Sequence, residues 1–573
     1  MTLCLPTGSR APVRTLLPTW PRGLRFLVAV AMGALVGLAF EPTNLWPLLF
    51  VGMAGWLMLF DPRLRPAGRG FGVGYGFGLG LGAVSLSWLS ALVEGVGPFL
   101  AAALIAFEAL FFGVLGVLVM WVRRLAWWPL AVGLSWAAVE FLYSRVPFGG
   151  FGWIRLAYAQ VDAPLAGLLP IVGVAGVTVV TATAGALLAA LVVRLWANPR
   201  GWVCPATVTM GVLIGSAGVI SLTAGYQPAE PTGDVDEPVT IGMVQGNVDG
   251  GAGIGAMGRA RSVTNNHLGE TINLMARARA GVVPMPDFVL WPENSTDIDP
   301  QIDAQTRATV TAAVAIAERP ILVGAVTEGP GEDERQTTAL WWDPDAGVTD
   351  TYHKRDLVPF GEYIPFRDVL LPRIPLLELV GAQSVPGTGP GVLTGELPDG
   401  RIIQVGDVIC FELAYDDTVH EAVRGGQVLV VQSNNATYRG TAQIPQQFAI
   451  TRVRAMEARR EIVVSTTNAE SGFIDPFGRV LDRTRVGTAA SNSYSVPVRT
   501  GLTPAVRFAE VYDVLILLGA GVGIMWAGRI AWVHRRTDRQ SVFGDKMGHN
   551  GLSTASRLGP LTTTERSDRG GQH

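Results

Sequence analysis

Three reactive side chains stand out in the polar half of the chain: a thiol, a carboxylate and an amine. Cys410 is the only cysteine in residues 235–500, and it ends the apolar run 402–409. Glu293 lies in LWPENSTD, and Lys354 lies in YHKRDLVPFGEYIP. A thiol with an ordinary pKa of about 8.5 is mostly protonated at neutral pH, so it benefits from an adjacent base. Together the three residues predict a Cys-Glu-Lys site that attacks carbonyl carbon.

Each of these side chains has a separate role in such chemistry. Glu293 would take the thiol proton, provided that partial burial raises its pKa. Lys354 would stabilise the oxyanion of a tetrahedral intermediate, helped by a backbone N–H next to the nucleophile. Taken alone, Cys410 is better interpreted as a small buried hydrophobic residue. The presence of Glu293 and Lys354 in suitable segments favours the catalytic interpretation.

Short strands alternating with helices are predicted to position these residues, in one α/β domain over residues 235–500. Such alternation favours a layered fold whose functional groups lie at strand ends. Glu293, Cys410 and Asn434 directly follow strand-like runs, whereas Lys354 follows a predicted hairpin of TALWWDP with VTDTYHK. The runs are PVTIGMVQGNV, DFVLWPEN, PILVGAVTE, RIIQVGDVICFE, QVLVVQSNN and EIVVSTTNAE, and the helical patterns cover 267–280, 302–317 and 449–460.

The rest of the chain has the composition of a membrane protein. Charged residues make up 16% of the chain and hydrophobic residues 49%, whereas ordinary soluble domains are about 25% charged. A spanning helix needs about 20 mainly apolar residues, and we expect seven spans within residues 26–224 and an eighth at 514–533. The spans are 26–40 and 45–60, which form a hairpin turning at 41–43, then 71–93, 99–122, 125–141, 165–193, 203–224 and 514–533.

Arginines precede the first span and lie in every second connection between these spans. Because Lys and Arg are retained on the cytoplasmic side, residues 1–25 and 534–573 are predicted to be cytoplasmic and the catalytic domain extracytoplasmic. Arg145 and Arg155, after the fifth span, are exceptions to the pattern. The tail 534–573 is polar and rich in Gly, Ser, Thr and Arg, which predicts disorder.

Glycines and glutamates inside the spans predict how the helices pack and where polar groups lie. Glycine occupies every second position from Gly72 onward, so Gly74, Gly78 and Gly82 form a small-xxx-small face suited to close helix packing. Glu108 and Glu140 lie in apolar spans, where an ionisable group either lines a polar entrance to the site or pairs within the bundle.

Composition also excludes several classes of protein and site. A net charge of −3 without a basic stripe argues against a nucleic-acid binder. The remaining cysteines, Cys4 and Cys204, cannot form a disulfide framework or a Cys-x-x-Cys metal site with Cys410. We therefore expect neither a metal ion nor a cofactor.

The reactive segments resemble those of the nitrilase superfamily and, within it, the membrane apolipoprotein N-acyltransferases of bacteria. WPE around Glu293, HKRDLVPFGEYIPF around Lys354 and ICFE around Cys410 match that family's catalytic segments in order. FEPTNLWPL at 40–48 and GGFGWIRLAYAQVDAPLAGLLPIVGV at 149–174 resemble its membrane signatures. The resemblance covers about residues 24 to 533. It implies a polytopic helical membrane bundle joined to an αββα nitrilase-like domain.

The same resemblance implies a ping-pong acyl transfer in the bacterial cell membrane. Cys410 would take the sn-1 acyl chain of a phospholipid as a thioester, and the α-amino group of an apolipoprotein's S-diacylglyceryl cysteine would then accept it. Glu362 and Glu412 would support the charged network around Lys354, together with Asn434. Phe411 stands where many members have tyrosine. Similar proteins in some actinobacteria are fused to, or associate with, a polyprenol-phosphate mannose synthase, which makes that enzyme a candidate partner.

Two other functions remain open at this point. A membrane-tethered amidase or acyl hydrolase would release the acyl group to water, although an anchor requires one helix rather than eight. A non-enzymatic carrier or scaffold would use the outer domain to recognise lipid or protein. Function that survives Cys410→Ala would favour the scaffold, and fatty-acid release without an amine acceptor would favour the hydrolase.

Overall fold

The computed structural model describes residues 20–60, 67–91, 96–197, 237–251 and 258–555, together with 211 and 215. The predicted seventh span, 203–224, lies outside the described residues apart from those two positions. Residues 1–19 and 556–573, at the ends of the predicted cytoplasmic segments, also lie outside them.

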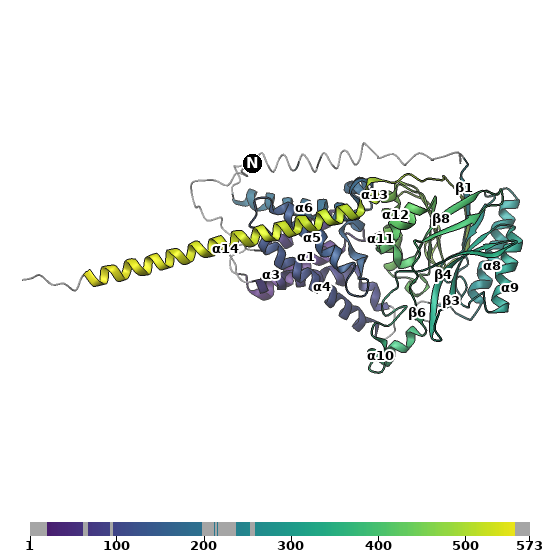
Figure 1. Ribbon diagram of the computed structural model, residues 1–573, viewed down its shortest axis with the longest axis horizontal. Helices are drawn as coiled ribbons and strands as arrows, with labels where there is room; N and C mark the ends of the chain where they lie inside the picture. Colours follow the sequence, from purple (N-terminus) through teal and green to yellow (C-terminus); the bar gives the residue numbers. More distant parts are fainter. Residues whose placement is uncertain are drawn as a thin grey trace, which may run out of the picture.

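The described helices of the membrane region form a bundle at one end of the molecule, and α14 runs along it (Figure 1). Among the described residues, three segments are long and apolar enough to cross a membrane: Gly97–Val122, Pro164–Trp196 and Ala509–Val533. The predicted hairpin appears as two packed helices, α1 and α2. The bundle helices are α1 (Arg22–Gly37), α2 (Pro47–Met58), α3 (Ala67–Ser85), α4 (Gly97–Val122), α5 (Trp128–Tyr143), α6 (Leu169–Ala197) and α14 (Ala509–Ala555).

Helix α3 packs tightly between its neighbours because its glycines leave room for their backbones. A Cβ atom on Gly74 would lie 2.0 Å from the carbonyl oxygen of Phe112 on α4. On another face of α3, a Cβ on Gly80 would lie 1.9 Å from the carbonyl oxygen of Val30 on α1. The predicted packing role of this glycine pattern is confirmed, and it involves two helices rather than one.

Two predicted spans differ from the structure at their ends. The third, predicted to reach residue 93, ends as α-helix at Ser85 and continues as the 3-10 turn η1 (Ser87–Ala91). Hydroxyls there bond to preceding carbonyls, as Ser87 does to Val84, and such bonds compete with regular helix. The sixth begins at Leu169 and is interrupted at Gly173, whose φ is 66°. It follows three 3-10 turns: η2 (Gly152–Ile154), η3 (Leu156–Gln160) and η4 (Pro164–Leu168).

Helix α14 continues past the predicted end of the eighth span, as far as Ala555. Nucleation is the unfavourable step of helix formation, and the apolar span has already formed a helix. No proline interrupts the polar residues that follow it. Extension of the existing helix therefore needs only propagation.

The domain over residues 237–498 is built on two mixed sheets that face each other across an apolar core. The first has the order β13-β1-β2-β3-β4-β5, with β6 beside β4, and the second has the order β12-β11-β10-β9-β8-β7. The first sheet comprises β1 (Val239–Gln245), β2 (Phe288–Leu290), β3 (Ile321–Glu328), β4 (Glu334–Asp343), β5 (Gly347–His353), β6 (Gln383–Ser384) and β13 (Ala490–Val496). The second comprises β7 (Val392–Glu396), β8 (Ile402–Ile409), β9 (Val428–Ser433), β10 (Ile462–Thr466), β11 (Gly472–Ile474) and β12 (Val480–Arg483).

Strand direction brings the predicted site residues to one edge of the sandwich. Strands β2 and β3 are parallel, and β5 runs in the same direction because β3–β4 and β4–β5 are both antiparallel. The segments after β2 and β5, which carry Glu293 and Lys354, therefore leave the first sheet at the same end. In the second sheet β8 and β9 are parallel, so Cys410 and Asn434 also share an end.

Helices cover both outer faces of this sandwich. α8 (Ser262–Arg279) and α9 (Ala304–Ala317) pack on the first sheet, on the side away from the bundle (Figure 1). α11 (Asp416–Gly425) and α12 (Gln443–Ala458) pack on the second sheet and face the bundle (Figure 1). Their apolar side chains belong to the same core as those of the bundle, including Phe448, Val453 and Trp153. The remaining helical turns are α10 (Arg367–Leu370), η5 (Pro375–Val380), η6 (Cys410–Ala414), η7 (Ala436–Tyr438) and α13 (Pro504–Arg507).

Candidate active site

The structure brings Glu293, Lys354 and Cys410 into one buried site at the edge of the two sheets. Their exposed fractions are 3%, 1% and 8%. The Lys354 Nζ donates to Glu293 Oε1 at 2.9 Å and to Glu362 Oε1 at 2.8 Å. Glu362 is thus a direct partner of Lys354, as predicted for a supporting residue. One ammonium between two carboxylates is the central electrostatic feature of the site.

Glu293 is held from both sheets. Its second carboxylate oxygen, Oε2, accepts a hydrogen bond from the backbone N–H of Asn434 at 2.7 Å. Asn434 therefore acts on Glu293 through its backbone, while its side-chain oxygen accepts from Thr467. Gly324 on β3 allows the Glu293 loop to lie close, because a Cβ there would be 2.2 Å from the Pro292 carbonyl oxygen. The carboxylate is consequently fixed before any substrate arrives.

Cys410 begins the turn η6 directly after β8, in a conformation that L-residues rarely adopt. Its φ is 54°, in the left-handed region. Such a backbone costs of order 1–3 kcal/mol and persists only where the surroundings hold it. Burial raises the pKa of the Cys410 thiol, the Glu293 carboxylate raises it further, and Lys354 opposes them only in part, which leaves it at about 12. The resting Cys410 side chain is therefore a thiol, and a base would be needed to form its thiolate.

The charges of Glu293 and Lys354 suit that requirement. Burial raises the pKa of Glu293, and the neighbouring ammonium limits the rise. Burial would lower the pKa of Lys354, but the carboxylates of Glu293 and Glu362 outweigh it and hold that pKa well above its usual value. A buried carboxylate with a raised pKa can take a proton near neutral pH, while the lysine stays cationic. The arrangement can generate a thiolate and stabilise an oxyanion.

Glu412 joins the lysine segment to the cysteine turn without touching Lys354. Its Oε1 accepts from the Tyr352 hydroxyl and from the backbone N–H of Arg355, both at 2.7 Å. Its Oε2 accepts from the backbone N–H of Ile409 at 2.8 Å. Since these groups flank Lys354 and precede Cys410, Glu412 fixes the spacing between the two. Burial raises the pKa of Glu412 to about 7.

Phe411 connects the nucleophile turn to the membrane region. Its ring stacks on Phe151 and Trp153, with centroids 5.8 and 5.9 Å apart, and Tyr415 packs against it edge to face at 5.4 Å. Phe151 and Trp153 belong to the GGFGWIR segment, which the sequence singled out as a membrane signature. The residue after the nucleophile therefore contacts the bundle rather than the domain core alone.

Gln446 on α12 connects the catalytic domain to the bundle, a role that the sequence did not indicate. Its Oε1 accepts from the indole N–H groups of Trp88 and Trp153, at 3.0 and 2.8 Å. Its Nε2 donates to the backbone carbonyls of Glu41 and Ser85, both at 2.9 Å. All four bonds run from the catalytic domain to the bundle. No local pattern distinguishes this glutamine from its neighbours, because its partners come from distant parts of the chain.

The two acidic residues predicted within spans have different surroundings. Glu140 is bonded within the bundle to the Trp136 indole, the Thr178 hydroxyl and the backbone N–H of Leu156. It therefore has the pairing role rather than that of an entrance residue. Glu108 is buried, and its Oε2 has no hydrogen-bond partner among the described residues.

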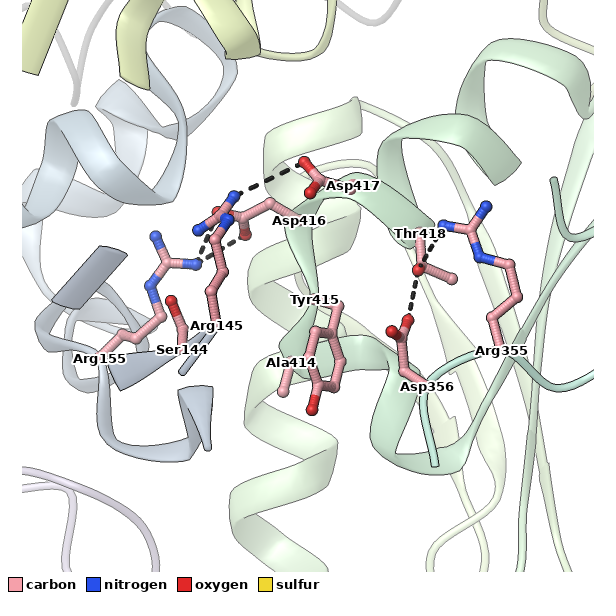
Figure 2. Close-up of a pocket in the computed structure, with 10 residues that line it drawn as sticks. All are labelled: Ser144, Arg145, Arg155, Arg355, Asp356, Ala414, Tyr415, Asp416, Asp417 and Thr418. Atoms are coloured by element: carbon pink, nitrogen blue, oxygen red, sulfur yellow. Dashed lines mark hydrogen bonds and ion pairs between the residues drawn. The ribbon is translucent and has the colours of Figure 1, made fainter. Parts of the chain in front are cut away.

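A cavity of about 110 Å³, lined mainly by charged and hydroxyl-bearing residues, lies where the bundle meets the two catalytic segments (Figure 2). Residues 144, 145 and 155 of the bundle form one side, residues 355 and 356 form another, and residues 414–418 lie between them. Asp356 and Tyr415 come from the lysine and cysteine segments respectively. The cavity thus borders both segments on the side that faces the bundle.

Two family models match the chain. A model of the apolipoprotein N-acyltransferase N-terminal domain matches residues 32–187, and a carbon-nitrogen hydrolase model matches residues 254–490. The apolipoprotein N-acyltransferase of Mycolicibacterium smegmatis is 34% identical over 87% of this chain and 84% of its own length. That of Azotobacter vinelandii is 29% identical over 86% of this chain and 92% of its own length.

Solved structures of a nitrilase-superfamily amidase from Nesterenkonia also match. One of them is 17% identical, covers 49% of this chain and 97% of the amidase, and has a TM-score of 0.34.

Proposed function

The chain belongs to the apolipoprotein N-acyltransferase family, and from that premise we propose that it transfers the sn-1 acyl chain of a phospholipid to apolipoproteins. The acceptor is the α-amino group of their N-terminal S-diacylglyceryl cysteine. The observation that best supports the proposal is the buried ion pair of Lys354 and Glu293, whose side chains lie 2.9 Å apart. Beside it lies the Cys410 turn, and the Phe411 ring of that turn stacks on Trp153 next to the bundle.

In the first half-reaction the acyl chain moves to Cys410. Glu293 takes the thiol proton, and the thiolate adds to the sn-1 carbonyl carbon. Lys354 stabilises the oxyanion that forms, since a fixed cation in a dry site is effective there. The carbon–oxygen bond then breaks, Glu293 returns its proton to the glycerol oxygen, and a lysophospholipid leaves. The acyl chain remains as a thioester on Cys410.

In the second half-reaction the acceptor amine displaces the thiol. The neutral α-amino group adds to the thioester carbonyl, and Lys354 again stabilises the oxyanion. Glu293 takes the proton that the nitrogen loses as the carbon–sulfur bond breaks, and then returns it to the thiolate. The product is an N-acyl amide, and the thiol is restored. Glu362, Glu412 and Asn434 serve in both halves by holding Lys354 and Glu293 in place.

The membrane arrangement that suits this reaction has eight spans, with the catalytic domain on the extracytoplasmic face of a bacterial plasma membrane. Support comes from the three described apolar segments and from the arginines at every second connection. Both termini would then be cytoplasmic. A polyprenol-phosphate mannose synthase partner would meet the cytoplasmic segment that follows the last span.

Acyl transfer between two defined substrates tests the proposal. The purified protein is incubated with a phospholipid labelled in its sn-1 acyl chain and a synthetic S-diacylglyceryl lipopeptide. We expect the label in an amide on the peptide's α-nitrogen and an equal amount of lysophospholipid, with no product from Cys410→Ser. Labelled free fatty acid in place of the amide, with or without peptide, would instead identify the hydrolase alternative.

A further inference from the structure

We propose that Arg155, Asp416 and Arg454 form a positioning clamp that fixes the Cys410 turn against the membrane bundle, so that lipid bound beside the bundle meets the thiol. This inference rests on the proposed function. It assigns a role to Arg155, one of the two arginines that broke the basic-loop pattern of the sequence.

The clamp begins with a buried ion pair between the bundle and the domain. Arg155, in the connection between α5 and α6, places one guanidinium nitrogen 2.7 Å from both carboxylate oxygens of Asp416 (Figure 2). The exposed fractions of the two side chains are 3% and 10%. Asp416 is the first residue of α11 and directly follows the Cys410 turn and Tyr415. A movement of the bundle loop is therefore transmitted to the segment after the nucleophile.

Arg454 on α12 completes the clamp and contacts the turn itself. It donates to the carbonyl oxygen of Leu413, three residues after Cys410, at 3.0 Å. It also donates to Asp416 at 2.8 Å, to the Tyr158 hydroxyl at 3.1 Å and to Glu457 at 2.7 Å. One guanidinium thus binds the turn, the bundle and its own helix. Arg454 is 1% exposed, so water cannot substitute for these partners.

Glu457, a partner of Arg454, connects the clamp to the interruption of α6 at Gly173. Glu457 Oε1 accepts a hydrogen bond from the backbone N–H of Val174 at 3.0 Å, next to the left-handed Gly173. Glu140 of α5 lies 3.6 Å from Arg155 at the other end. The chain of charges therefore ties α5, α6, α12 and the Cys410 turn together. Removing one member leaves a buried charge without its partner, which is costly.

The clamp acts on orientation rather than on the chemistry of the triad. None of its three residues bonds to Glu293, Lys354 or the Cys410 thiol, and Glu412 already fixes the Lys354–Cys410 spacing. We therefore expect its loss to reduce reaction with a membrane lipid much more than reaction with a small reagent from water.

The test compares two reactions of Cys410 in the purified full-length protein in lipid nanodiscs. One is thioester formation from phospholipid, and the other is alkylation by iodoacetamide across pH. In Arg155→Gln we expect thioester formation to fall at least tenfold while the pH profile of alkylation stays unchanged. Asp416→Asn, which removes the carboxylate that Arg155 and Arg454 share, should reduce thioester formation at least as much.

A matched control is the ion pair Arg452–Asp162, which also joins α12 to the connection between α5 and α6. It is more exposed, at 18% and 43%, and neither side chain bonds to the Cys410 turn. Arg452→Gln should leave thioester formation unchanged.

Two outcomes would overturn the clamp: a normal rate of thioester formation in Arg155→Gln and Asp416→Asn, or a parallel loss of acylation and alkylation in both variants. Either result leaves the proposed function standing if the unmodified protein forms the thioester. Failure of the unmodified protein to form it with any phospholipid would overturn both proposals.

Discussion

Glu293 and Lys354 act on the Cys410 thiol with opposite electrostatic signs. The carboxylate raises the thiol pKa, and the ammonium lowers it, while burial dominates both. The carboxylate's useful property is therefore its ability to accept a proton, and that of the ammonium is its fixed positive charge. This division separates the two roles experimentally.

Raising the pH should rescue one variant and not the other. Glu293→Gln should slow acylation of Cys410 roughly 100-fold, because the base is lost. It also removes a negative charge beside the thiol, so the thiol pKa falls and higher pH supplies thiolate. Lys354→Met should slow acylation about 100-fold to 1000-fold, because an oxyanion donor is lost, and here the thiol pKa rises. Thioester formation measured by mass spectrometry between pH 7 and 10 should show partial rescue of Glu293→Gln alone. Equal rescue of both variants, or of neither, would mean that the roles are wrongly assigned.

Glu412 offers a second test among the supporting residues. Glu412→Ala removes every bond that links Tyr352, Arg355 and Ile409 through this carboxylate. We expect acylation to fall by more than tenfold, because the spacing of Lys354 and Cys410 is no longer fixed. Tyr352→Phe removes a single one of these bonds and should have a much smaller effect. Comparable losses of acylation in the two variants would show that the single Tyr352 bond determines the rate. The connection that Glu412 makes between the lysine and cysteine segments would then not be needed.

Helix α3 shows how an element can depend on the absence of a side chain. A Cβ on Gly74 meets the backbone of α4 at 2.0 Å, whereas a Cβ on Gly72, one half-turn earlier, meets nothing within 4 Å. Gly74→Val should therefore push α3 and α4 apart and lower the thermal unfolding temperature of the detergent-solubilised protein. Gly72→Ala should be neutral or slightly stabilising, because alanine is the better helix former. A stable, monodisperse Gly74→Val protein would contradict this packing.

Local sequence patterns predicted the strands that carry the site, and long-range contacts explain what they missed. β8 and β9 are short segments rich in Ile and Val, and the β4–β5 hairpin has Gly347 with φ of 76° at its turn, so each was visible locally. The Arg155–Asp416 pair spans 261 residues and the Trp88–Gln446 bond spans 358. Such contacts leave no periodic signal in a single sequence. The exceptional position of Arg155 was the one hint, and its buried partner accounts for it.

The helical extension of α14 depends on the segment that precedes it. Composition predicts disorder for residues 534–573, and in the structure the preceding apolar helix continues to Ala555. A window average does not register that a helix already formed can propagate into polar sequence.

The orientation of the whole molecule in the membrane can be tested with engineered cysteines. In a protein lacking Cys4 and Cys204, a membrane-impermeant thiol reagent applied to intact cells without outer layers should label Ala346→Cys, at the exposed β4–β5 turn. It should not label Gly559→Cys in the tail until the membrane is opened. The opposite labelling pattern would refute the orientation inferred from the arginines.

The proposed reaction passes through one covalent intermediate, the acyl chain on Cys410. Under that proposal its formation requires a lipid delivered by the bundle, a base at Glu293 and a cation at Lys354. No acceptor is needed at this stage, so the intermediate should accumulate when the acceptor is withheld.

Mass spectrometry of the purified protein after incubation with phospholipid alone tests this most directly. We predict one added acyl mass on the peptide that contains Cys410, in a linkage that hydroxylamine removes, and none in Cys410→Ser. Acyl mass confined to Cys4 or Cys204, or none anywhere while the lipopeptide is still acylated, would contradict a Cys410 thioester mechanism.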